Sequence, residues 1–131
     1  MNAQKNLLLE QQQSKLETLA NFDVLTGLPN RQYLMKILSS LLAKNERENT
    51  ELCLMFLDVD GFKSINDSFG HDTGDKFLLH ISAIMSQTLP DNATLGRLGG
   101  DEFLVIVDNA SIQGNAEHIA TKLINSVMKA H

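Results

Sequence analysis

The stretch Gly99-Gly100-Asp101-Glu102-Phe103 decides the fold, because two glycines followed by two carboxylates separate two strand-like segments. An apolar segment ends at Leu98, and the run 103–107 is β-branched and aromatic. The pattern predicts a hairpin whose glycines adopt the positive φ angles of a tight turn. Such a hairpin holds Asp101 in a fixed place. A carboxylate there is suited to bind a divalent cation, especially beside an acid from another strand.

The composition indicates one acidic domain. The chain has 131 residues and a formal net charge of -5, and a chain of this length buries roughly two-thirds of its unfolded surface in a single core. A general nucleic-acid binder has a basic surface, so we expect no nucleic-acid partner. The longest apolar run, 52–57, is far shorter than the ~20 residues of a membrane-spanning helix. We therefore expect no direct membrane contact of this piece, in a parent protein that is free to carry a membrane anchor elsewhere. The single cysteine, Cys53, cannot form an internal disulfide, so a cytoplasmic location is expected.

Residues 1–20 are predicted to form a helical lead-in, and residues 21–131 the domain itself. Leu9, Leu16 and Leu19 have heptad-compatible spacing, although Gln12 interrupts the seam. Two interpretations stay open: a solvated helix, or the end of a coiled-coil connector from an upstream sensor domain.

Apolar periodicity predicts the next elements. A helix is expected from Asn30, as N-cap, to Lys44, followed by a loop over 45–49. The run 52–57 has no polar alternation and is interpreted as a central strand buried on both faces, which ends at Asp58.

After this strand, a polar loop is expected over 66–74, then a helix to Leu89 that Pro90 stops. The hairpin follows, and a last amphipathic helix with Asn115 as its cap. This order predicts an α+β fold, an α/β sandwich with a mostly antiparallel sheet flanked by helices. Three strands make a thin sheet, so we expect the complete fold to include a further strand or strand pair after the last helix.

The acids at the two strand ends have the pattern of a magnesium-dependent phosphoryl-transfer site. Asp58 and Asp101 come from different strands, with Asp60 and Glu102 beside them. Magnesium prefers hard oxygen ligands and stays bound to substrate phosphates. Between two carboxylates, it would bring a 3′-hydroxyl and an α-phosphate together and neutralise the charge on a leaving pyrophosphate.

The residues after Asp58 are suited to a nucleotide. The bend Gly61-Phe62-Lys63 would expose backbone N–H groups to a phosphate, and Lys63 adds a positive charge. Asn66 and Asp75 have the donors and acceptors to bind guanine, although Asp75 is equally typical of a helix start and Asn66 of a turn. His71 is placed to donate to a ribose or phosphate oxygen, or to brace its loop.

Four motifs, in order and spacing, resemble the GGDEF family of diguanylate cyclases. They are Asp23-x-Leu25-Thr26-Gly27-Leu28-Pro29-Asn30-Arg31, Asp58-x-Asp60-x-Phe62-Lys63-x-x-Asn66-Asp67, Gly70-His71-x-x-Gly74-Asp75 and Arg97-x-Gly99-Gly100-Asp101-Glu102-Phe103. The resemblance implies a fold like the palm of nucleotidyl cyclases and polymerases. It also implies condensation of two GTP molecules to cyclic di-GMP, with release of pyrophosphate, in a homodimer whose subunits each bring one GTP.

The resemblance assigns roles to named residues. Metal ligands for Mg²⁺ or Mn²⁺ are Asp58, the Val59 carbonyl and Asp101, and the catalytic residues are Asp101, Lys63 and Glu102. Substrate contacts fall on Phe62, Lys63, Asn66, His71, Asp75 and Gly100, where the glycine lets the nucleotide approach the hairpin. Asp101 is also implied as the base that deprotonates the 3′-hydroxyl.

Two departures qualify this expectation. Many relatives have an Arg-x-x-Asp product-inhibition motif where this chain has Pro90 and Ala93, so inhibition by cyclic di-GMP is expected to be weak. The family domain also continues with strands and a helix that carry phosphate-binding Lys and Arg residues, so these 131 residues alone are expected to turn over little or not at all. The alternative function is an inactive GTP-binding regulatory module of a larger signalling protein, for example with a downstream phosphodiesterase domain.

Overall fold

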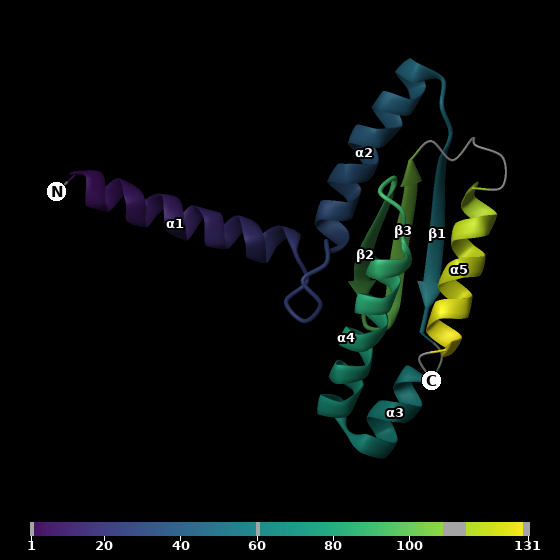
Figure 1. The fold of residues 1–131 in the computed structure, drawn as a ribbon. Helices are drawn as coiled ribbons and strands as arrows, with labels where there is room; N and C mark the ends of the chain where they lie inside the picture. The colour runs from purple at the N-terminus through teal and green to yellow at the C-terminus, as the bar shows by residue number, and fades with distance from the viewer. Residues whose placement is uncertain (1, 60, 109–114, 130–131) are drawn as a thin grey trace.

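The fold combines five helices with a small sheet in the part of the chain that the computed structural model describes, residues 2–59, 61–108 and 115–129. The elements are α1 (Asn2–Asn21), α2 (Arg31–Glu48), β1 (Leu52–Asp58), α3 (Phe62–Phe69), α4 (His71–Thr88), β2 (Ala93–Gly99), β3 (Glu102–Asp108) and α5 (Asn115–Lys129) (Figure 1). The predicted α+β class is confirmed, with helices on both sides of an antiparallel sheet.

β3 is the central strand of the sheet. The order is β1-β3-β2, and β3 pairs antiparallel with both neighbours. Its residues 103–107 are all buried, because α4 and α5 pack on one face and α2 packs on the other. The strand that follows the glycine pair therefore forms the middle of the core.

β1 corrects one prediction, that the run 52–57 is a central strand buried on both faces. Within the described residues β1 lies at the edge of the sheet. Cys53, Met55 and Leu57 pack on the core, whereas Leu54 is 40% exposed and Phe56 is 70% exposed on the other face. An apolar run does not reveal how many neighbours a strand has, since pairing depends on distant segments.

α2 is held close to the sheet by a glycine. A Cβ atom at Gly96 of β2 would lie 2.4 Å from Leu34 Cδ1, and Leu34 is fully buried. Asn30 caps this helix as predicted, because its side chain accepts a hydrogen bond from Tyr33 N. The close approach fixes α2 beside the strand that leads into the hairpin.

The predicted end of this helix is wrong by about one turn. The sequence indicated a loop over 45–49, but α2 continues to Glu48 and closes at Asn49 in the left-handed region, with φ 56°. Asn45 is only 5% exposed, and its Nδ2 donates to Leu41 O and to Asp108 Oδ1. A polar residue with buried partners therefore sits inside the helix where the sequence indicated a loop.

The predicted polar loop over 66–74 is also wrong, because α3 and α4 fill this region. They meet at Gly70, whose φ of 90° allows the sharp change of direction. Phe62, Ile65 and Phe69 have the i, i+3, i+7 spacing of a helix. The turn-forming residues Asn66 and Asp67 masked this short pattern.

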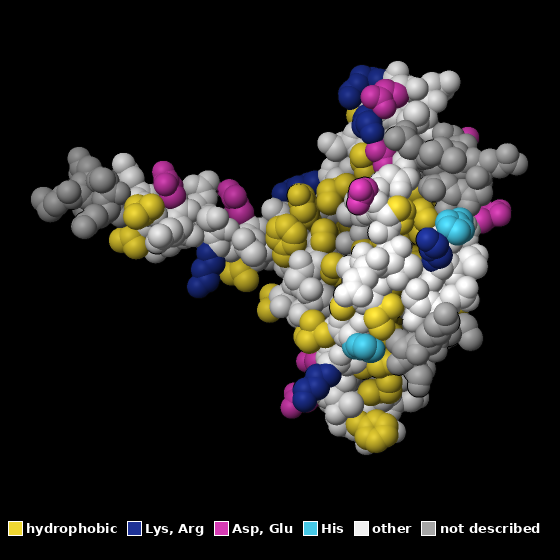
Figure 2. Space-filling view, viewed as in Figure 1, with side chains coloured by type: hydrophobic (Ala, Val, Ile, Leu, Met, Phe, Trp, Pro, Cys, Tyr) yellow, Lys and Arg dark blue, Asp and Glu magenta, His cyan; other side chains and the backbone are white. Residues whose placement is uncertain are grey.

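α1 extends away from the sheet (Figure 1) and carries hydrophobic side chains on its surface (Figure 2). Leu9, Leu16 and Leu19 are 63%, 66% and 55% exposed. The predicted helix is confirmed, whereas its role as a lead-in and the coiled-coil interpretation stay predictions. The last predicted helix is confirmed as α5, which begins at Asn115 itself, one residue before the start expected with Asn115 as its cap. The side chain of Asn115 lies outside the described residues. None of the helices described here has the length and hydropathy to span a membrane.

Candidate nucleotide and metal site

The hairpin between β2 and β3 is shaped by its glycines. Gly99 has φ 149° and Gly100 has φ 51°, so the predicted positive φ angles are confirmed. The two loop residues are Gly100 and Asp101, because Gly99 still pairs with Glu102, after a bulge between Arg97 and Gly99. Asp101 therefore lies in the turn itself, at the end of the central strand.

The ends of β1 and β3 bring predicted metal and catalytic residues together at the hairpin end of the sheet. Asp58 is the partner of Glu102 in the strand register. One residue further, Val59 N donates to Asp101 O over 3.0 Å. Asp58 and Glu102 are exposed residues and line a hollow of about 220 Å³ together with Phe56 and other residues. The backbone of Asp101 is thus tied to the residue that follows Asp58.

The oxygen atoms at the hairpin end of the sheet are suitable ligands for a hard cation. Mg²⁺ and Mn²⁺ prefer carboxylate and carbonyl oxygens, which Asp58, Asp101 and the Val59 carbonyl supply. Across residues 2–59, 61–108 and 115–129, no group of three His, Cys, Asp or Glu side chains has the arrangement of a metal site. The predicted set uses two acidic side chains and a carbonyl, so it stays a prediction. Asp60, noted beside Asp58 in the sequence, lies outside the described residues.

The turn from β1 into α3 contains the predicted phosphate contacts. Gly61 has φ 83° at the N-cap of α3, and Phe62 N donates to Val59 O at 3.5 Å. Phe62 packs its ring against the core, and Lys63 is exposed in the first turn. The start of a helix combines unpaired N–H groups with a positive dipole end, which is the arrangement that binds anions.

The predicted guanine contacts lie on α3 and at the start of α4. Asp75 and His71 are exposed on α4. Asn66 is half-buried on α3, and its Oδ1 atom is buried with no hydrogen-bond partner among the described residues. A buried acceptor without a donor is unfavourable, so the burial of this oxygen costs stability.

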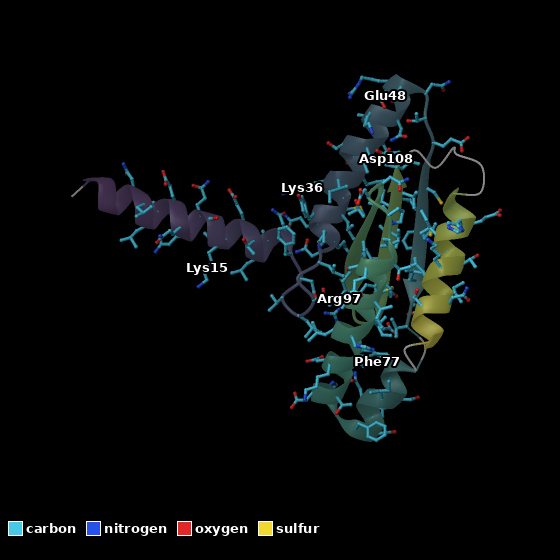
Figure 3. The ribbon with its side chains drawn as sticks, in the orientation of Figure 1. Lys15, Lys36, Glu48, Phe77, Arg97 and Asp108 are labelled. Atoms are coloured by element: carbon cyan, nitrogen blue, oxygen red, sulfur yellow. The ribbon has the colours of Figure 1, made fainter. Side chains whose placement is uncertain are left out.

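An ion pair fastens the hairpin to the loop after α1. Arg97 Nη1 lies 3.1 Å from Asp23 Oδ2, and both side chains are largely buried. The same guanidinium donates to Gly100 O from Nε at 3.0 Å and from Nη2 at 2.8 Å. Figure 3 shows Arg97 beside this loop. Arg97 therefore connects the loop 22–30 to the turn that carries Asp101.

Asp23 is stabilised in its charged form. Partial burial acts to raise the pKa of Asp23, but the hydrogen bonds from Thr26 and Arg97, with the positive charge of Arg97, outweigh it and hold the pKa below its usual value. Thr26 donates from its backbone N and from Oγ1 to Asp23 Oδ2, each at 2.8 Å. The carboxylate thus keeps its charge for Arg97 at neutral pH.

Residue spacing did not predict this pair. Asp23 and Arg97 each open a motif quoted above, but they are 74 positions apart. Both residues belong to the motifs of the family, but the motifs do not say that the two side chains are in contact. The fold brings them together.

Comparison with known proteins identifies the family. The family model described as "Diguanylate cyclase, GGDEF domain" matches residues 20–131. The diguanylate cyclase DgcP of Escherichia coli is 39% identical over 104 residues, which cover 77% of this chain and 30% of that protein. The cyclic di-GMP phosphodiesterase PdeR of Escherichia coli is 38% identical over 114 residues, which cover 85% of this chain and 17% of that protein. The chain thus spans less than a third of either relative.

A solved structure has the same fold. The coiled coil and GGDEF domain of DgcB from Caulobacter crescentus, in complex with c-di-GMP, superposes with a TM-score of 0.84 at 28% identity, over 95% of this chain and 63% of that one. The chain therefore belongs to the GGDEF domain family, as its four motifs predicted.

Proposed function

We propose that this chain is the catalytic GGDEF domain of a diguanylate cyclase, which condenses two GTP molecules to cyclic di-GMP as a dimer. The supporting observation is the hydrogen bond from Val59 N to Asp101 O, which joins the end of β1 to the hairpin where the predicted metal acids lie. Family membership and the similarity to DgcP support the same conclusion.

In this proposal the reaction has two equivalent halves. The 3′-hydroxyl oxygen of each GTP attacks the α-phosphorus of the other, and the bond from that phosphorus to pyrophosphate breaks. Asp101 takes the hydroxyl proton, and Lys63 and Glu102 complete the catalytic set. Two bonds form and two break, so each cyclic di-GMP is accompanied by two pyrophosphates.

The substrate residues hold each GTP for this attack. Phe62 and Lys63 bind the phosphates at the start of α3, and Gly100 leaves room for the nucleotide at the hairpin. Asn66 and Asp75 select guanine, with His71 nearby. Asp58, the Val59 carbonyl and Asp101 would hold Mg²⁺ or Mn²⁺, which supplies a Lewis acid for the phosphoryl oxygens.

A second candidate function is a non-catalytic GTP-binding module. It is favoured by the similarity to PdeR, which is named as a phosphodiesterase and of which this chain matches 17%. In that role the domain would bind GTP and regulate a neighbouring domain. An upstream sensor joined through α1 is proposed for either function.

Pyrophosphate release separates the two candidates. The full-length protein is incubated with GTP and MgCl₂, and pyrophosphate and cyclic di-GMP are measured, with ATP as the control substrate. Both products from GTP, and none from ATP, support the cyclase. GTP binding without pyrophosphate release supports the regulatory module and contradicts the cyclase.

Inhibition by the product is proposed to be weak. Pro90 and Ala93 line a hollow of about 330 Å³, and the other residues that line it are Leu28, Ser86, Leu89, Asp91 and Leu95. Neither Pro90 nor Ala93 carries a charge to bind a phosphate of cyclic di-GMP. Adding the product at concentrations well above those formed in the assay is expected to leave the initial rate nearly unchanged.

A further inference from the structure

Gly74 occupies a position where glycine is not needed by the backbone. It lies inside α4, where any residue adopts the helical conformation and alanine is a better helix former. Gly27, Gly61, Gly70, Gly99 and Gly100 have positive φ angles that favour glycine, but Gly74 is not among them. The presence of glycine at position 74 is therefore explained by the space beside it rather than by the backbone conformation.

The space beside Gly74 is filled by Asn66. A Cβ atom at position 74 would lie 1.6 Å from Asn66 Oδ1 and 2.8 Å from Asn66 Cγ. It would also lie 3.2 Å from Phe62 Cε2. Because real Cβ contacts are essentially never shorter than 3.0 Å, any side chain at this position forces Asn66 to move.

The carboxamide that Gly74 accommodates is the one with an unpaired buried oxygen. Oδ1 of Asn66 has no hydrogen-bond partner in the described ranges, yet it is held against the backbone of α4. No hydrogen bond within the described residues holds this oxygen, so packing fixes its position. The contact with Gly74 is therefore what sets the direction of the Asn66 side chain.

We propose that Gly74 is a positioning residue for guanine selection, because it leaves the space in which the Asn66 carboxamide takes up its base-binding orientation. This inference rests on the proposed function, in which Asn66 contacts guanine. Gly74 acts only through Asn66 and touches no substrate itself.

A double-mutant cycle in the full-length protein tests this inference, with the ratio of ATP to GTP dissociation constants as the readout. Gly74→Ala and Asn66→Ala are each expected to lower the ratio about tenfold, the effect of one lost hydrogen bond to a base. In the Asn66→Ala background, Gly74→Ala is expected to change the ratio less than twofold, because the amide it displaces is already absent. Thr73→Ala, which places alanine at the preceding exposed position, is the control.

The outcomes separate the inference from the proposed function. A full-length protein that does not prefer GTP overturns both. If the unmodified protein prefers GTP, two results overturn the inference alone. In the first, Gly74→Ala keeps the preference. In the second, Gly74→Ala lowers the ratio as much in the Asn66→Ala background as in the unmodified protein. If Gly74→Ala does not fold, the double variant must fold again, since the contact is then relieved. A double variant that stays unfolded also overturns the inference.

Discussion

The two ends of the sheet use polar residues differently. At the end away from the hairpin, Asp108 accepts hydrogen bonds from Lys44 Nζ at 2.6 Å and from Asn45 Nδ2 at 2.9 Å. Asn45 in turn accepts a hydrogen bond from Thr50 Oγ1. At the hairpin end, the exposed residues Asp58 and Glu102 are opposite each other in the strand register. Figure 3 shows Asp108 and Arg97 at these opposite ends.

The difference indicates separate roles for the two ends. The network around Asp108 joins α2 to β3 and the segment before β1, and its buried polar groups are matched to each other. Like charges that face each other across a strand pair repel each other, so the pairing of Asp58 with Glu102 adds an unfavourable term to the free energy of folding. A bound cation would offset this repulsion. Substitutions at the hairpin end are therefore expected to lower activity, and substitutions at the Asp108 end are expected to lower stability.

Asp101→Asn is expected to have the largest effect, on activity. Pyrophosphate release from GTP and Mg²⁺ should fall at least about a hundredfold, because a metal ligand and base is lost. The melting temperature should stay near that of the unmodified protein, since Val59 bonds the backbone of Asp101 rather than its side chain. Asp91→Asn, which changes an exposed acid before β2, is the control. Nearly normal turnover in Asp101→Asn would contradict the assignment.

Asn45→Ala is expected to have the reverse effect, at the other end of the sheet. Removing its carboxamide breaks its hydrogen bonds to Asp108 Oδ1 and Leu41 O and takes away the acceptor of Thr50 Oγ1, which costs about 2–3 kcal/mol in the free energy of unfolding. Thermal unfolding should occur about 5–10 °C lower, with unchanged turnover per folded molecule. Glu46→Ala, on the same helix and exposed, is the control. An unfolding free energy within about 0.5 kcal/mol of the unmodified value would show that the network is not stabilising.

Asp75→Ala separates guanine selection from helix stability at the hairpin end. If Asp75 accepts hydrogen bonds from guanine, GTP affinity should fall about tenfold and ATP affinity less than twofold. Asp72→Ala removes the acid in the first turn of α4 and serves as the control for the helix dipole. Calorimetric titration of both nucleotides measures the ratio. An equal loss for GTP and ATP would place Asp75 outside the base site.

Asp23→Asn is expected to have the smallest effect, about 1 kcal/mol of stability near neutral pH. Because the pKa of Asp23 is lowered in the folded state, its contribution is present above the unfolded value of 3.8 and is lost as the pH falls through the lower folded value. Urea unfolding of the unmodified protein should therefore show a loss over this acidic range that Asp23→Asn lacks. Matching pH profiles for the two proteins would contradict the lowered pKa.

The comparison also shows what the sequence can predict. The glycines at 99 and 100, the cap at Asn30 and the stop before Pro90 are local signals, and the structure has a turn or a helix end at each. The edge position of β1, the burial of Asn45 and the pair of Asp23 with Arg97 depend on segments far apart in the chain. Residue spacing alone contains no information on which distant groups meet, so these features had to come from the fold.

We propose that Asp58 and Asp101 bind one divalent cation together. The most direct measurement is a crystal structure of the full-length protein with a non-reactive GTP analogue and Mn²⁺, located by its anomalous scattering. We expect a metal ion with carboxylate oxygens of both residues within about 2.0–2.3 Å. A nucleotide bound with its metal ion held by neither carboxylate, or by residues on another surface, would contradict it.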